Sequence, residues 1–245
     1  MEEANQTIWY KKTGGRVFLA ILFFFFALVI IFGGLIGYYL WKIKFDQGFN
    51  FSELNNNTDL SSALISDSEK DVSKYIRLAD PQVGSIGAPV TILAFMDFDC
   101  AVSHSAYPAF WAMRQKYEPV VKIVYKTVSF TETSSAGFQS ALASTCAKDQ
   151  NKFEEYFQAL FGSGQSLEKE ALLQTAKDIG LDMKIFSACL NSQKNISVIT
   201  QNNKDAVEVG LRGTPTFLVN NKKIEGNLNN KKWDEILVEV MTKKD

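Results

Sequence analysis

The order of apolar and polar positions divides the chain into an apolar N-terminal run, a polar connecting segment and a longer region of mixed pattern. From Val17 to Trp41 nearly every residue is apolar and none carries a charge. A run of about 25 residues exceeds the roughly 20 that a helix needs to cross the hydrocarbon core of a bilayer. The pattern therefore predicts a transmembrane helix over 17–41, with an N-terminal tail at 1–16.

Two other interpretations of the apolar run fit it less well. A buried helix of a globular domain normally keeps a polar face, which this run lacks. A cleaved signal peptide has an apolar region of about 7–15 residues followed by small residues. Here the run is longer and ends at 38–41 in an aromatic cluster, which suits a membrane interface. We expect an uncleaved anchor.

The charges that flank this run favour one orientation only slightly. Three basic residues lie in 1–16 and two in 42–44. The simpler assignment under the positive-inside rule leaves the short tail in the cytoplasm. We therefore expect a single-pass protein of the cell membrane with an extracytoplasmic C-terminal domain.

The remaining chain predicts a tether and one α/β domain. The segment 42–79 is rich in Asn, Ser and Asp and lacks a sustained apolar period, whereas turn-forming residues from Asp80 to Pro89 mark the start of a domain at 80–245. Strand and helix patterns then alternate around a helical insert at about 134–209, which predicts a mixed sheet covered by helices. The expected elements are strands at Val90–Phe98, Val120–Val128, Thr216–Asn220 and Lys223–Glu225, and helices at Ala101–Trp111, within 135–210 and at Lys231–Met241.

Composition excludes several classes of function. The 26 Lys and Arg residues nearly balance the 27 Asp and Glu residues and are scattered, so we expect no nucleic-acid partner. Three cysteines and one histidine do not supply the paired spacing of a zinc site. We expect no metal and no cofactor.

The candidate chemistry centres on Cys100, which lies between a predicted strand and a predicted helix. Free N–H groups and the helix dipole favour an anion at a helix N-terminus, so a cysteine there tends to become a nucleophilic thiolate. A redox pair would place its second cysteine three residues later. That position holds Ser103.

Several motifs resemble the DsbA-like thiol–disulfide oxidoreductases, which are thioredoxin-fold proteins with a helical insert. The resemblance covers roughly 80–241 and implies a thioredoxin-like mixed sheet, an inserted helical subdomain and activity on protein disulfides. The motifs that carry it are Ala88–Ile92, Phe95–Cys100 with Pro108, Cys146–Phe153, Phe186–Leu190 and Gly210–Phe217.

The chain departs from this family at the second active-site cysteine. Members typically carry Cys-x-x-Cys, in which one thiolate attacks a disulfide and its neighbour resolves the mixed disulfide. Serine cannot take the second step, so Cys100 would form mixed disulfides with cysteine-containing client proteins and would need an external thiol for release. Ser103 would at most donate a hydrogen bond to the sulfur. A binding or chaperone-like module that has lost its chemistry, and an engineered Cys-to-Ser site, remain open alternatives.

The resemblance also assigns roles to residues distant in sequence. It implies a cis peptide bond at Thr214-Pro215, in a loop that faces Cys100 and shapes the substrate groove, whereas an ordinary trans proline is the alternative. It implies a structural disulfide between Cys146 and Cys189. Two buried free thiols are the alternative to that bridge.

Three polar residues near Cys100 are candidate modulators of its ionisation. His104 lies four residues after the cysteine and would share a helix face with it, where an imidazolium would favour the thiolate; a solvated helix position is the alternative. Asp97 and Asp99 would point to one face of the strand and would oppose the thiolate or relay a proton, or serve only as solvated residues at a strand end. The nearby aromatics are expected in the core and groove wall: Phe98, Tyr107, Phe110 and Trp111.

Overall fold

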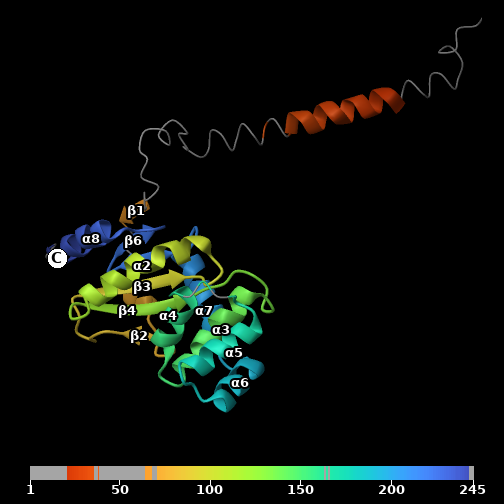
Figure 1. Ribbon diagram of the computed structural model, residues 1–245. Helices are drawn as coiled ribbons and strands as arrows, with labels where there is room; N and C mark the ends of the chain where they lie inside the picture. The colour runs from red at the N-terminus through yellow and green to blue at the C-terminus, as the bar shows by residue number, and fades with distance from the viewer. Residues whose placement is uncertain are drawn as a thin grey trace, which may run out of the picture. The chain divides into compact units, whose positions relative to one another are not determined.

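The computed structural model describes residues 21–35, 38, 64–67, 71–162, 164 and 166–242 (Figure 1). The chain forms two compact units, Met1–Thr58 and Asp59–Asp245. In the first unit residues 21–35 are helical, and no helix among the described residues is both long and apolar enough to cross a membrane. Parts of the predicted span 17–41 and the whole predicted tail 1–16 lie outside the described residues.

A mixed sheet forms the centre of the second unit, which confirms the predicted α/β architecture. Its strand order is β1-β6-β5-β3-β4-β2, and β3 and β4 are parallel while the other neighbours are antiparallel. The strands are β1 (Leu64–Asp67), β2 (Gln82–Val83), β3 (Val90–Met96), β4 (Val121–Thr127), β5 (Thr216–Val219) and β6 (Lys222–Glu225).

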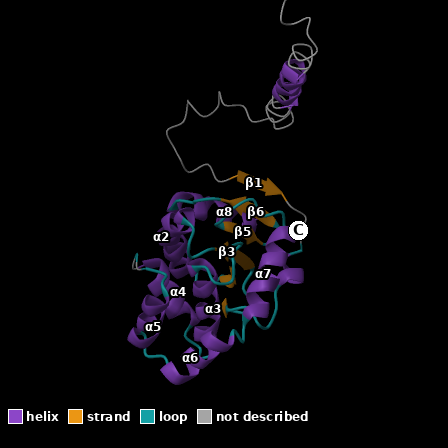
Figure 2. Ribbon diagram, turned by 90° about the vertical axis from the view of Figure 1, so that its right-hand side faces the viewer, coloured by secondary structure: helices purple, strands orange, loops and turns teal. Residues whose placement is uncertain are grey.

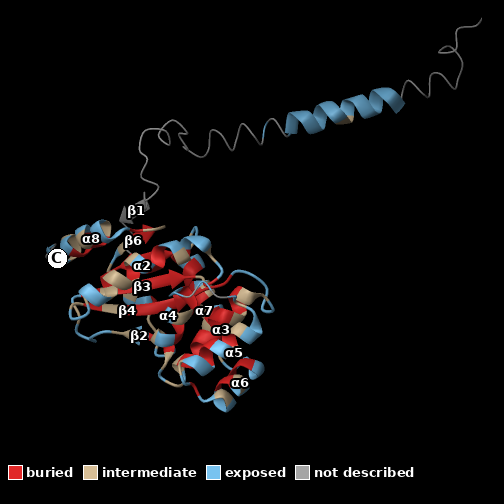
Figure 3. Ribbon diagram, viewed as in Figure 1, coloured by how far each residue is buried: buried red, intermediate tan, exposed pale blue. Residues whose placement is uncertain are grey.

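Both faces of the central strands are buried, as expected where helices cover a sheet on two sides (Figures 2 and 3). Successive side chains of a strand point to opposite faces. Ile92 and Ala94 of β3 accordingly join the larger apolar cluster, and Leu93 and Phe95 join the smaller one. The smaller cluster includes Ala206, which places α7 (Ile196–Glu208) on that side.

The larger cluster joins the other face of the sheet to the remaining helices of the second unit. The first helix on this side, α2, runs through Pro108 without ending there and continues to Lys116. The helical insert consists of shorter helices, and side-chain caps at Ser135 and Asp182 fix the starts of α3 and α6. The helices that contribute to this cluster are α2 (Ala101–Lys116), α3 (Ala136–Lys148), α4 (Phe153–Gly162), α5 (Lys169–Asp178), α6 (Met183–Ser192) and α8 (Asn230–Thr242); a short 3-10 helix, η3 (Val72–Tyr75), lies between β1 and β2 in the chain.

The turn before the candidate cysteine differs from the prediction. β3 ends at Met96 rather than at Phe98. The Asp97 carboxylate accepts a hydrogen bond from the amide of Asp99 at 2.9 Å, and the Asp97 carbonyl accepts one from the amide of Cys100 at 3.3 Å. Aspartate favours such turns because its side chain bonds the backbone two residues later. Asp97 and Asp99 are therefore turn residues, and the expectation that they share a strand face is wrong.

Candidate functional site

Cys100 is the N-cap residue of α2 and its thiol faces the loop between α7 and β5. The residue has extended backbone angles and its side chain does not cap the helix. The half-buried thiol instead donates a hydrogen bond from Sγ to the Thr214 carbonyl oxygen at 3.2 Å. The Thr214-Pro215 peptide bond that follows this carbonyl is cis. The structure thus brings together the predicted nucleophile and the predicted groove residues.

Two features of this position have opposite effects on the Cys100 sulfur: one favours a negative charge on it, and the other requires its proton. The first-turn amides of α2 lack intrahelical partners and form the positive end of the helix dipole, which favours a negatively charged sulfur. The hydrogen bond to Thr214 exists only while Cys100 carries its proton. Attack by the sulfur therefore requires this contact to break.

Ser103 occupies the place of the second cysteine but does not bond to the sulfur. Its side chain is fully buried, and its Oγ accepts a hydrogen bond from the Asp97 amide at 3.5 Å. The hydroxyl is therefore directed at the end of β3 rather than at Cys100. Its observed contact is with the backbone that positions the turn.

His104 is half-buried and partnered, so the interpretation of a solvated helix position is wrong. Its Nε2 lies 2.7 Å from the Phe98 carbonyl oxygen, and because a carbonyl can only accept, Nε2 carries the hydrogen. The imidazole also packs against the ring of Phe161, with centroids 4.9 Å apart. These contacts fix the imidazole beside the turn that precedes Cys100.

Asp97 lies in a partly buried position beside His104. Burial raises the pKa of the Asp97 carboxyl, and the nearby Asp99 carboxylate raises it further. The hydrogen bond from the Asp99 amide and the charge of His104 lower the pKa but do not cancel the effect of burial. Folding therefore raises the pKa of the Asp97 carboxyl above its ordinary value, chiefly through burial.

Gly137 permits the close approach of α3 to this turn, a role that the sequence analysis missed. A Cβ atom at Gly137 would lie 3.0 Å from the Asp99 Cβ and 3.4 Å from Asp97 Oδ1. Any side chain there would push the turn or the helix aside. A glycine in the first turn of a predicted helix is the signal that could have indicated this contact.

Cys146 of α3 and Cys189 of α6 form a disulfide with a Cα–Cα distance of 5.9 Å. Cys146 lies nine residues after Gly137 on the same helix, which corresponds to about 13 Å along the axis at 1.5 Å per residue. The disulfide therefore joins two helices of the insert away from the turn. With two of the three cysteines paired, Cys100 is the free thiol.

A surface hollow of about 350 Å³ lies alongside α2, between that helix and the segment before α8. On the α2 side it is lined by Ser105, Pro108 and Ala109, one to three turns after Cys100. Asn227–Asn230 line the other side. Polar and apolar groups thus meet in a depression on the helix that carries the cysteine.

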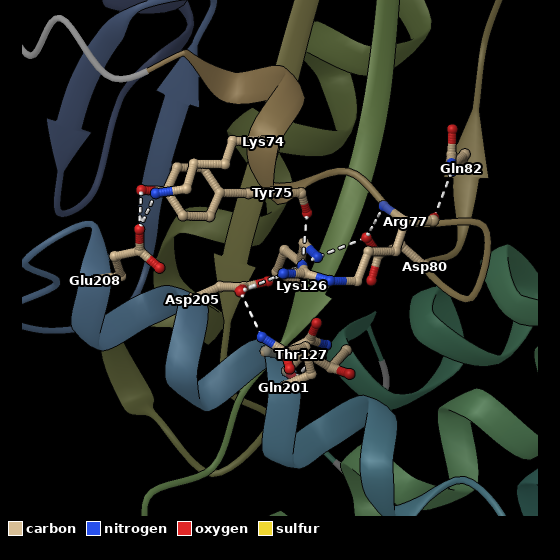
Figure 4. A network of polar contacts seen from close by, with 11 residues as sticks. Lys74, Tyr75, Arg77, Asp80, Gln82, Lys126, Thr127, Gln201, Asp205 and Glu208 are labelled. Atoms are coloured by element: carbon tan, nitrogen blue, oxygen red, sulfur yellow. Dashed lines mark hydrogen bonds and ion pairs between the residues drawn. The ribbon is translucent and has the colours of Figure 1, made fainter.

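A buried charge network lies on the opposite face of the sheet and was not predicted (Figure 4). Lys126 of β4 is fully buried, with its Nζ 2.5 Å from Asp80 and 3.1 Å from Asp205 of α7. Arg77 forms a second ion pair with Asp205. This network ties the segment before β2 to β4 and α7.

In the part of the chain that the structure describes, no group of three His, Cys, Asp or Glu residues could hold a metal ion.

Comparisons with known proteins agree with this architecture. Among solved structures, a thioredoxin-like oxidoreductase from Silicibacter pomeroyi DSS-3 is 21% identical, with a TM-score of 0.64 over 71% of this chain and 99% of that one. The thiol-disulfide exchange protein alpha-DsbA2 from Wolbachia pipientis is 17% identical, with a TM-score of 0.61 over 70% and 92% of the two chains. At such identities the likeness shows a shared fold.

The sequence relatives are longer proteins. The Na(+)/H(+) antiporter NhaA from Herminiimonas arsenicoxydans is 28% identical over 152 residues, which cover 60% of this chain and 24% of that protein. The chain therefore spans about a quarter of the length of the curated relatives it matches. A protein-family model described as thioredoxin matches residues 78–239, more than half of the chain. Given this match, the chain belongs to this thioredoxin family, and the solved structures show that it shares their fold.

Proposed function

We propose that the protein catalyses thiol–disulfide exchange on client proteins through Cys100 alone. The observation that carries the proposal is the placement of a half-buried free thiol at the N-terminus of α2, in contact with the Thr214 carbonyl. Helix N-termini activate cysteines as nucleophiles. Ser103 in place of a second cysteine supports a reaction without an internal redox pair.

The reaction conserves disulfide bonds and needs no net oxidant. The Cys100 thiolate attacks one sulfur of a client disulfide, forms a mixed disulfide and releases the other client sulfur as a thiolate. A second client thiolate then attacks the client sulfur of the mixed disulfide, which restores Cys100 and gives a rearranged client disulfide. An external small thiol can take the same step, in which case the client becomes disulfide-linked to that thiol.

The surroundings of Cys100 support a polypeptide substrate. Arg212 and Gly213, just before Thr214, are exposed, so an extended client segment can reach the backbone of this loop. The hollow beside α2 begins about one turn after Cys100 and offers space for a client side chain. A small thiol alone would use little of this surface.

The first test is the formation of a mixed disulfide. The full chain is mixed with a peptide disulfide at neutral pH, quenched with acid and analysed by mass spectrometry. We expect a peptide adduct on Cys100 that forms faster than the adduct of free cysteine, none in Cys100→Ser, and turnover only after a thiol is added. A rate no higher than that of free cysteine would sink the proposal.

A redox-inactive binding module is the second candidate. It is favoured by the Cys100 hydrogen bond to Thr214, which stabilises the unreactive thiol. This candidate predicts that Cys100→Ser binds an unfolded, cysteine-free client as tightly as the parent chain does. Exchange chemistry predicts instead that stable capture is lost together with the sulfur.

We further propose that 17–41 anchors the protein in the cell membrane, with the tail 1–16 in the cytoplasm, the tether 42–79 and the domain 80–245 outside it. The support is the uncharged apolar run and the aromatic cluster at its end. Alkaline carbonate extraction should leave the protein in the membrane fraction. Protease added to intact cells should digest the domain, and a protected domain would overturn the orientation.

A further inference from the structure

Two side chains of β6 hold the loop that presents the Thr214 carbonyl. At its start, the buried ammonium group of Lys223 donates a hydrogen bond to the Gly210 carbonyl. Two residues further on, the Arg212 guanidinium donates from Nε to a carboxylate oxygen of Glu225 at 2.7 Å, with a second contact from the same guanidinium. Charged groups on one strand thus hold the loop at both of these points.

Short backbone contacts fix the end of the same loop. The amide of Gly226 donates to the Pro215 carbonyl at 2.9 Å, and the Thr216 hydroxyl donates to the Gly213 carbonyl at 2.7 Å. Thr214 lies between these attachment points. The direction of its carbonyl toward Cys100 therefore depends on how firmly its neighbours are held.

Glu225 contacts both of the cations that hold the loop, Lys223 and Arg212. Its Oε1 lies 2.6 Å from Lys223 Nζ while its other oxygen accepts from Arg212. Burial raises the pKa of this carboxyl, but the hydrogen bonds from Arg212 and the nearby ammonium group of Lys223 outweigh burial, so its pKa lies below the ordinary value. Glu225 is consequently charged at neutral pH and keeps both cations in place.

We infer that Glu225 is a positioning residue for the Cys100 site: it fixes Arg212 and Lys223, and through them holds the loop so that the Thr214 carbonyl stays against the sulfur. The inference rests on the proposed exchange function for its meaning. The contact between the Cys100 sulfur and the Thr214 carbonyl can be tested separately, by a reaction of Cys100 that involves no client protein.

A looser loop has opposite effects on two reactions of Cys100. The hydrogen bond to Thr214 must break before Cys100 reacts, so weakening it frees the sulfur and speeds alkylation by a small neutral reagent. A client segment that pairs with the loop loses a fixed partner, so its reaction slows. A purely structural role for Glu225 would change the two rates in the same direction or leave both unchanged.

The test compares Glu225→Gln with the parent chain in two assays at neutral pH. We expect alkylation of Cys100 by iodoacetamide to become about threefold to tenfold faster, the range that loss of one hydrogen bond produces. We expect the second-order rate of mixed-disulfide formation with a peptide disulfide to fall by about the same factor. Parallel changes in both rates, or no change in either, would overturn the inference.

Two further variants guard against a folding defect. Arg212 is 67% exposed, so Arg212→Gln breaks one attachment while Glu225 keeps its ion pair with Lys223, and it should shift both rates in the same opposed directions, more weakly. Lys222→Gln removes an ion pair between the same strand and Glu239 of α8 and should leave both rates as in the parent chain. If the parent does not react with the peptide disulfide at all, the exchange function fails. The alkylation rates then still decide the role of Glu225.

Discussion

Replacing Lys126 with methionine should destabilise the domain far more than the loss of an ordinary ion pair. Its side chain is 0% exposed, and those of Asp80 and Asp205 are 2% and 1% exposed (Figure 4). Without Lys126, Asp205 keeps Arg77 and Gln201, whereas Asp80 keeps only the Arg77 amide. The substitution therefore leaves a carboxylate buried without a cation.

The magnitude follows from burial. Removing one partner of a buried ion pair costs about 3–5 kcal/mol, because the remaining charge has neither water nor a partner. For a domain of this size that corresponds to a fall in Tm of about 6–20 °C. An exposed pair is worth about 1 kcal/mol or less. Lys116 and Asp234, which are 59% and 40% exposed and 2.9 Å apart, form such a pair.

The assay is urea unfolding followed by circular dichroism for Lys126→Met and the matched control Lys116→Met. A third variant, Lys126→Met with Asp80→Asn, removes the charge left behind and should recover part of the lost stability, since residues in one network do not act additively. Equal destabilisation by the two single variants would refute the reasoning. So would a double variant less stable than Lys126→Met.

Three further predictions concern the site and the insert. Ser103→Cys should give a chain that closes a disulfide with Cys100, detected as the loss of two free thiols on mild oxidation; a chain that keeps both thiols would mean that the two sulfurs cannot meet. Reduction of the Cys146–Cys189 bridge, or its replacement by two alanines, should cost about 4 kcal/mol for a loop closed over 43 residues, measured by urea unfolding, less any strain released; an unchanged midpoint would contradict this. The raised pKa of Asp97 means that its contribution to stability is present below the unfolded pKa and is lost as pH rises through the folded pKa. Asp97→Asn should therefore stabilise the domain at pH 7 and not at pH 3, and a gain that is the same at both values would exclude this cause.

The long buried strands and the site cysteine were predictable because their signals are local. β3 is apolar on both faces and β4 on one, with Lys122 and Lys126 on its other face, and such apolar runs are typical of central strands. The two-residue β2 has no pattern of its own and exists only because β4 offers a pairing edge. The end of β3 was misplaced by two residues because the apolar Phe98 continues the run, whereas the Asp97 side chain starts a turn.

The contacts around the site depend on parts of the chain that meet only in the fold. His104 was not expected to find the Phe98 carbonyl, because that carbonyl becomes available only when the turn ends the strand. Lys223 and Glu225 alternate with Ile224, a pattern that normally puts the charged residues in solvent. They are buried because the loop between α7 and β5 packs over that face of β6.

Two separately supported structures meet at Cys100, and in the proposed exchange reaction this arrangement would let one cysteine suffice. The turn bonded by Asp97, Ser103 and His104 lies on one side of the sulfur, and the loop at Thr214 approaches it from the other. In a two-cysteine site the second sulfur resolves the mixed disulfide from within the helix. In the proposed reaction Ser103 supplies no second sulfur and its hydroxyl faces the strand end, so the resolving thiol would come from outside the helix. That thiol would need access to the sulfur that now contacts the Thr214 carbonyl, and we therefore expect the strength of the loop attachment to affect both capture and release.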